Sequence, residues 1–204
     1  TIAKLISGFY PVDGGEILIG GKNIQSYSEK ALIQNIAFVF QRSQLLKTSI
    51  YENVRIGNPQ ATRQQIMDAL DAANCTSILD KFPQREMTVI GAKGVYLSGG
   101  EVQRIAIARA ILKNANIVIM DEASAAADPE NEYELQQAFQ KLMRGKTVIM
   151  IAHRLSSIQN ADQILFVQNG KVVEQGTHNE LMACNGRYKD FQDVYCKANQ
   201  WRLA

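Results

Sequence analysis

Cysteine is scarce in this sequence, and its scarcity argues against two cysteine-based structures. The 204 residues include three cysteines, Cys75, Cys184 and Cys196, an odd number without the spacing of metal ligands. Neither a disulfide-stapled fold nor a cysteine-rich metal site is therefore expected. The pattern favours a reduced, cytosolic setting in which these cysteines act as small apolar residues.

Long apolar runs and an excess of one charge are also missing. The longest runs, such as IVIM and VIMIA, are far shorter than the roughly 20 residues that a membrane span needs, so no span is expected. No signal-peptide pattern is visible. The net charge is +2 and no basic cluster occurs, so nucleic acid is not expected as a partner.

Three apolar segments favour an α/β fold. They lie at Ile36–Phe40, at Ile117–Met120 and at Thr147–Ala152, and amphipathic helical patterns separate them. Apolar strands alternating with helices predict a parallel sheet that helices cover on both faces. A chain of this length, 46% hydrophobic and 21% charged, can form one globular domain with room for a subdomain.

Polar residues follow each of these three predicted strands. Gln41 comes after the first, Asp121 and Glu122 end the second, and His153 ends the third. Ligands bind parallel sheets at the carboxyl ends of the strands. If the strands are neighbours, these four side chains converge on one crevice.

The convergence predicts a site for Mg²⁺ and a phosphate chain. Asp121 would hold the metal, with Gln41 completing its shell. Glu122 would orient and deprotonate an attacking water, and His153 would contact the γ-phosphate. Each residue alone has an ordinary alternative as a solvated, capping or loop residue, but their joint placement at corresponding strand ends favours the functional interpretation.

The segment YLSGGEVQR at Tyr96–Arg104 predicts a helix start of an unusual kind. Ser98 and Glu101 match a capping box. The two glycines between them are not needed for a cap, and each costs up to about 1 kcal/mol relative to alanine in a helix. Gly99 and Gly100 leave backbone N–H groups uncovered at the positive end of the helix dipole, which predicts an anion site suited to phosphate.

These residues together resemble the ATP-binding subunits of ABC transporters. The family's signature motif is similar to LSGGE at Leu97–Glu101, although its last position is more often Gln. The Walker B strand is similar to IVIMDEAS, the D-loop to SAAAD ending at Asp128, and the H-loop to IAHRLS. Gln41 resembles the Q-loop glutamine. The order and spacing of these motifs agree with the family along the whole chain.

The resemblance implies a P-loop NTPase-like parallel sheet flanked by helices, with an inserted α-helical subdomain. It implies a nucleotide-binding core in residues 1–41 and 115–204, and the helical subdomain with the signature motif in residues 42–114. ATP and Mg²⁺ are the implied cofactors. The signature residues Ser98 to Glu101 would bind, in trans, the ATP held by a second nucleotide-binding domain.

Two segments further resemble the exporter type. They are Thr88–Gly94, TVIGAKG, and the C-terminal GTHNELMACNGRYKDFQDVY. The implied partners are a second nucleotide-binding domain, in a homodimer or heterodimer that Asp128 would contact, and the transmembrane domains of the same transporter. The implied location is the cytoplasmic face of the plasma or inner membrane. Two departures are Ala92, where Glu is usual, and the D-loop sequence SAAAD, where TSALD is usual.

The family's P-loop is expected immediately before Thr1, so Thr1 would adjoin the nucleotide and the 204 residues alone are expected to be inactive. One alternative is a soluble ABC-type ATPase of DNA repair, chromosome maintenance or translation, which usually has coiled-coil insertions or two cassettes. Another alternative, from a different class, is a non-enzymatic regulatory module.

Overall fold

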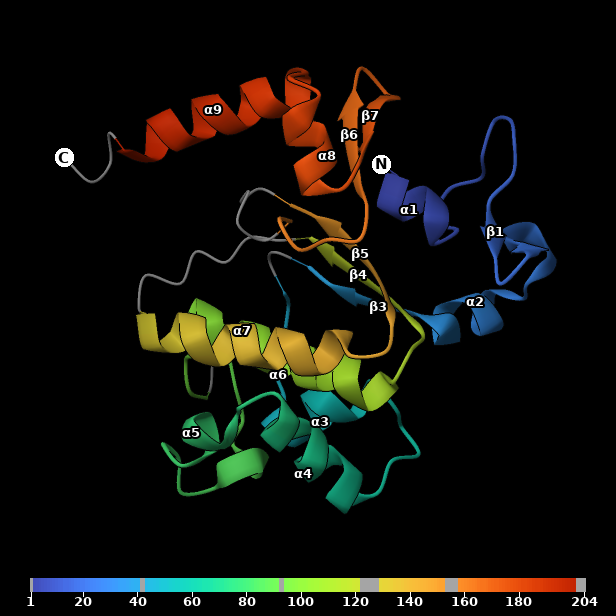
Figure 1. Ribbon diagram of the computed structural model, residues 1–204. Coiled ribbons are helices and arrows are strands. Elements are labelled where there is room, and N and C mark those ends of the chain that lie inside the picture. The colour runs from blue at the N-terminus through green and yellow to red at the C-terminus, as the bar shows by residue number, and fades with distance from the viewer. Residues whose placement is uncertain (1, 41–42, 92–93, 122–128, 153–157, 201–204) are drawn as a thin grey trace. The chain divides into compact units, whose positions relative to one another are not determined.

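The computed structural model describes residues 2–40, 43–91, 94–121, 129–152 and 158–200, and gives only the backbone of residues 129–130 and 197–200. The chain divides into two compact units, Thr1–Ile151 and Ala152–Ala204 (Figure 1). Each unit is described by itself below. The boundaries predicted at residues 41 and 114 are not tested by this division and stay predictions.

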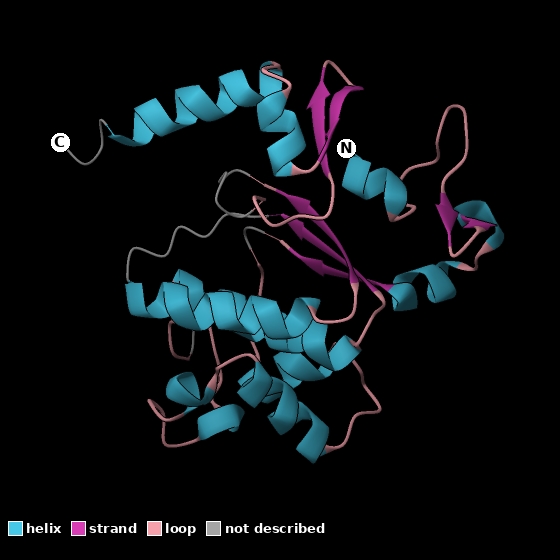
Figure 2. Ribbon diagram, in the orientation of Figure 1, coloured by secondary structure: helices cyan, strands magenta, loops and turns pink. Residues whose placement is uncertain are grey.

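A parallel sheet lies at the centre of the first unit (Figure 2). Its strands are β3 (Ile36–Val39), β4 (Ile117–Asp121) and β5 (Thr147–Ile151), in the order β3-β4-β5. Ile36 pairs with Ile117, and Ile117 pairs with Thr147, so the three strands start level. The predicted strands are thus present and adjacent, and β4 is the middle one.

Alternate residues of the strands pack into two different hydrophobic clusters. Val118 and Met120 face a large cluster that includes residues of the helices α3, α4, α6 and α7. Ile36 and Ile119 face a smaller cluster with Ala3 of α1 (Ile2–Ile6). Since side chains alternate between the faces of a strand, helices cover the sheet on both faces. The predicted α/β class is confirmed.

Burial differs between the strands that were predicted to be buried. Val118 to Met120 of β4 are at most 3% exposed, whereas β5 is half-buried and its Ile151 is 38% exposed. The prediction of a buried strand holds for β3 and β4 but not for β5. Both β3 and β5 are outer strands of the described sheet, but Ala37 and Val39 of β3 are buried in the large cluster, whereas Val148 and Met150 of β5 are only partly buried against it.

The helical insertion lies between β3 and β4 in the sequence. It contains α3 (Ile50–Arg55), α4 (Arg63–Ala72), α5 (Thr76–Leu79), the 3₁₀ helix η2 (Arg85–Met87) and α6 (Gly99–Lys113). The side chains of Ser49, Thr62 and Ser98 cap α3, α4 and α6. Figure 1 shows α7 (Pro129–Met143) lying along α6, with α3, α4 and α5 on the side of α6 away from the sheet.

Short elements precede β3. The strands β1 (Leu18–Ile19) and β2 (Lys22–Asn23) form an antiparallel hairpin. Its turn is Gly20-Gly21, with φ of 58° and 75°, a region that glycine enters without strain. The 3₁₀ helix η1 (Ile24–Ser26) and helix α2 (Glu29–Asn35) follow.

The second unit is built from a hairpin and two helices. The strands β6 (Ile164–Gln168) and β7 (Lys171–Gly176) pair antiparallel around an Asn169-Gly170 turn. Helix α8 (His178–Ala183) starts with a capping box of Thr177 and Glu180. Helix α9 (Arg187–Gln200) follows, and Tyr188 packs with Ile164 and Leu181 in the core of this unit.

No helix in the described ranges is both long enough and apolar enough to cross a bilayer.

Candidate functional site

The N-terminus of α6 has the predicted capping box. Ser98 is the N-cap residue, in extended conformation. Its Oγ accepts a hydrogen bond from the Glu101 N–H at 3.3 Å, and Glu101 Oε2 accepts one from the Ser98 N–H at 2.7 Å. The Glu101 carboxylate therefore turns back toward Ser98, as predicted, and does not cover the N–H groups of Gly99 and Gly100.

Neither glycine of this helix start is required by packing. A Cβ atom on Gly99 would meet nothing within 4 Å, and one on Gly100 would lie 3.7 Å from Cβ of Asn131, an ordinary contact. Neither glycine has a positive φ. The first N–H groups of a helix have no partner inside it. Two unnecessary glycines thus leave these groups open on an accessible surface, which fits an anion better than it fits a purely structural cap.

Glu101 has a second partner that the sequence pattern did not indicate. The Lys81 Nζ donates to Glu101 Oε1 at 2.7 Å, and the Glu101 side chain is only 7% exposed. Burial opposes ionisation of this carboxyl, but hydrogen bonds from Lys81 and Ser98 outweigh burial, and the pKa of Glu101 is lowered. The carboxylate is therefore charged at neutral pH and compensated by a lysine.

Arg104 connects α6 to the start of α7. Its side chain is fully buried, and its guanidinium forms an ion pair with Glu134. It also donates to the Asn74 carbonyl at 2.8 Å and to Asn131 Oδ1 at 3.1 Å. Asn131 is the residue beside Gly100. This network fixes the signature helix against the helix that follows the predicted D-loop.

The carboxyl ends of the three strands lie side by side. Asp121 is the last residue of β4 and pairs with Ile151 of β5, while Met120 pairs with Val39 of β3. Gln41 follows Val39 by two residues, and His153 follows Ile151 by two. The condition behind the predicted convergence, that the strands are neighbours with level ends, is therefore met.

Most side chains of the predicted phosphate site lie outside the described residues. Within the described ranges, no three His, Cys, Asp or Glu side chains gather as a metal site. Of the two predicted magnesium ligands, only Asp121 is described. Six residues named in the sequence analysis lie outside the described residues: Thr1, Gln41, Ala92, Glu122, Asp128 and His153.

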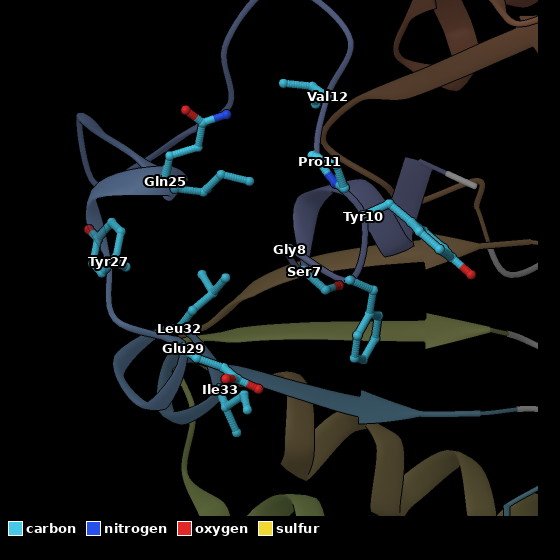
Figure 3. Close-up of a pocket in the computed structure, with 12 residues that line it drawn as sticks. Ser7, Gly8, Tyr10, Pro11, Val12, Gln25, Tyr27, Glu29, Leu32 and Ile33 are labelled. Carbon is cyan, nitrogen blue, oxygen red and sulfur yellow. The ribbon is translucent and has the colours of Figure 1, made fainter.

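A cavity of about 430 Å³ lies where the sequence predicted no site. In Figure 3, Gln25 and Leu32 line one side of it, and Pro11 and Val12 line the other. Glu29 is the one charged residue among its lining residues, so the cavity does not suit a phosphate. No local pattern could predict it, because it forms between segments that are far apart in sequence.

A shallower groove of about 220 Å³ lies beside the signature motif. Residues 43, 45–47, 90–91 and 95–97 line it, together with Val102 of α6. Leu46 and Tyr96 on this surface are 59% and 84% exposed. The groove thus exposes apolar side chains from the stretch after Gln41 and from the stretch just before LSGGE, which follows the exporter-type segment Thr88–Gly94.

Comparisons with known proteins agree with the motifs. The family model described as ABC transporter matches residues 1–125. ABC transporter B family member 4 of Dictyostelium discoideum is 47% identical over 188 residues, which cover 92% of this chain and 24% of that protein. The ATP-dependent lipid A-core flippase of Pasteurella multocida is 44% identical over 195 residues, 95% of this chain and 34% of the flippase.

Another bacterial relative, whose name gives a different role, is similar to nearly the same degree. The putative multidrug export ATP-binding/permease protein YgaD of Bacillus subtilis is 43% identical over 189 residues, 93% of this chain and 33% of that protein. The chain spans about a quarter to a third of the length of these three relatives. Family match, parallel sheet and signature helix agree: the chain belongs to the ABC transporter family, and its resemblance to the exporter-type ATP-binding domains is confirmed.

Proposed function

We propose that this chain is the ATP-binding and ATP-hydrolysing domain of an ABC exporter, which powers transport across a membrane. The observation that carries the proposal is the start of α6, where Glu101 turns back to Ser98 and neither Gly99 nor Gly100 has a side chain that could cover its N–H group. A helix N-terminus of this kind attracts phosphate through its N–H groups and its dipole.

The strand ends would supply the hydrolytic side chains. Asp121, at the carboxyl end of β4, is a carboxylate of the kind that Mg²⁺ binds, and Gln41 would complete the shell. Mg²⁺, when bound with ATP, neutralises phosphate charge. Glu122 would orient and deprotonate the attacking water, and His153 would hold the γ-phosphate. Thr1 would adjoin the nucleotide at the expected P-loop.

A second nucleotide-binding domain is the partner that this arrangement needs. Ser98, Gly99 and Gly100 would contact the ATP of the other domain, with Glu101 supporting them as the cap. Asp128 would lie at the same interface. In support, Ser98 and Gly99 are exposed and ready for such contact. Whether the pair is a homodimer or a heterodimer is a separate property of the whole transporter.

Transmembrane domains of the same transporter are the other proposed partners, which would place this domain at the cytoplasmic face of the membrane. The groove beside the signature motif supports this contact, because Leu46 and Tyr96 expose apolar surface there. Exposed apolar grooves of this kind suit the apolar face of an incoming helix. The Ala92 departure falls in the segment that borders this groove.

The test is the ATPase activity of the full-length protein and of its Glu122→Gln variant. We expect the wild type to hydrolyse ATP, and the variant to lose hydrolysis by about 100-fold or more while still binding ATP, because the residue that activates water is gone. Glu16→Gln, which removes the same charge from an exposed loop, is the matched control and should keep full activity. Unchanged turnover in the Glu122→Gln protein would refute the proposal.

A further inference from the structure

The buried carboxylate of Glu101 poses an electrostatic problem for a phosphate site. Glu101 lies in the first turn of α6, next to the exposed Ser98 and Gly99. Its side chain is 7% exposed, so water screens its charge poorly. A negative charge in such a place repels an incoming phosphate. A cap that helps the helix would therefore weaken the anion site, unless a positive charge offsets it.

Lys81 supplies that positive charge from another part of the chain. It lies just after α5, and its Nζ is 2.7 Å from Glu101 Oε1. The other oxygen, Oε2, is used by the Ser98 N–H. Each carboxylate oxygen thus has its own donor. The Lys81 side chain is 57% exposed, so its ammonium stays partly hydrated and its burial costs little.

We infer that Lys81 is a positioning residue of the signature site, which cancels the charge of Glu101 and holds its carboxylate away from the N–H groups that receive the triphosphate. The inference rests on the proposed function of that site. Lys81 does not touch ATP in this view and acts only through Glu101. A glutamine at position 101 would cap the helix without needing Lys81, since its side chain is neutral.

A purely structural role for the ion pair makes different predictions. Lys81 itself is more than half exposed, and thermal unfolding shows whether the Lys81→Gln protein is folded. If the pair only held the fold, the loss in Lys81→Gln would appear in thermal unfolding and leave the KM of the folded protein unchanged. If Lys81 offsets a charge, removing Glu101's charge as well restores the site.

The experiment is a double-mutant cycle in the full-length protein, with KM for ATP and kcat as readouts. For Lys81→Gln we expect KM to rise about ten-fold with kcat changed less than about two-fold, because the ground-state attraction of the phosphate is weakened. When position 101 is already Gln, which caps the helix without a charge to offset, adding Lys81→Gln should change KM by less than about two-fold. Lys81→Arg, which keeps the charge, should also match the wild type.

The control is Lys30→Gln, which removes the same charge from an exposed position on α2 and should leave KM unchanged. Thermal unfolding of each variant shows whether it is folded; if Lys81→Gln is not, Lys81→Met takes its place in the cycle. A Lys81→Gln protein with the KM of the wild type, or a Lys81→Gln change that raises KM as much in the Glu101→Gln background as in the wild type, would overturn the inference. Refutation of the proposed function would look different: the wild-type protein would lack ATPase activity, or the Glu122→Gln variant would be active.

Discussion

Two helices of this chain start with the same four-residue capping box, but they differ in the residues inside the box and in the burial and partners of its glutamate. Ser98 and Glu101 cap α6, and Thr177 and Glu180 cap α8, each with reciprocal hydrogen bonds. The positions between the cap residues are Gly-Gly in α6 and His-Asn in α8. Glu101 is buried and paired with Lys81, whereas Glu180 is exposed. The cap defines a helix start, and its neighbours decide whether that start can receive a ligand.

The largest expected effect concerns how the two helices are anchored. Arg104 of α6 is buried in an ion pair with Glu134, whereas α8 buries only Leu181. Arg104→Met leaves Glu134 without its partner, and we expect the free energy of unfolding of the chain to fall by about 3 kcal/mol. Urea unfolding measures this loss.

The surface ion pair of Arg55 with Glu52 is the matched control for this loss. Both side chains of that pair are more than 40% exposed, so Arg55→Met should cost less than about 1 kcal/mol. Equal losses in the Arg104→Met and Arg55→Met proteins would show that burial does not distinguish the two pairs.

The next largest effect comes from exchanging a residue between the two helix starts. Gly100 of α6 and Asn179 of α8 occupy the same position after the cap. Gly100→Asn has room, since its Cβ would make only ordinary contacts, so the helix should keep its stability. We expect ATPase activity of the full-length protein to fall about 100-fold, because a side chain then covers the N–H groups that would bind phosphate.

The reverse exchange, Asn179→Gly, is the control for that experiment. It should lower stability by up to about 1 kcal/mol, the cost of glycine in a helix, and leave ATPase activity unchanged. Full ATPase activity in the Gly100→Asn protein would mean that the open helix start of α6 has no part in hydrolysis.

Local features of this fold could be predicted from sequence, and features made by distant residues could not. The cap of Ser98 and Glu101 could be predicted because both of its hydrogen bonds form within one helical turn. Lys81 gives no such signal, since it reaches Glu101 from the turn after α5, 20 residues earlier in the sequence. Arg104 stands in a pattern that predicts a helix, but its burial depends on Glu134, 30 residues later. The predicted convergence at the strand ends depends on strand order, which alternating strands and helices do not give; the strands are neighbours, and the convergence itself stays a prediction.

A smaller effect is expected from removing the cap hydroxyl in each helix. Ser98→Ala and Thr177→Ala should each lower the free energy of unfolding by about 1 kcal/mol, since each loses one capping hydrogen bond. Only Ser98→Ala should also reduce ATPase activity, by about ten-fold, because only that hydroxyl adjoins the proposed phosphate. Urea unfolding and ATPase assays separate the two effects, and an equal loss of ATPase activity in both variants would contradict the comparison.

The smallest expected effect is in the pH dependence of stability. Burial opposes ionisation of Glu101, but its hydrogen bonds from Lys81 and Ser98 leave its pKa lowered. A carboxyl whose pKa is lowered by folding stabilises the fold above its ordinary pKa, about 4.3, and this contribution is lost as the pH falls through the lowered value. Urea unfolding between about pH 6 and pH 3 should therefore show a shallower decline of stability in Glu101→Gln than in the wild type.

The backbone and hydroxyl of Thr177 lower the pKa of Glu180 as well, so Glu180→Gln should flatten the decline of stability in the same direction. The two carboxylates thus stabilise their helices with the same sign of pH dependence, and a Glu101→Gln protein with an unaltered pH profile would show that the buried carboxylate is not held in its charged form.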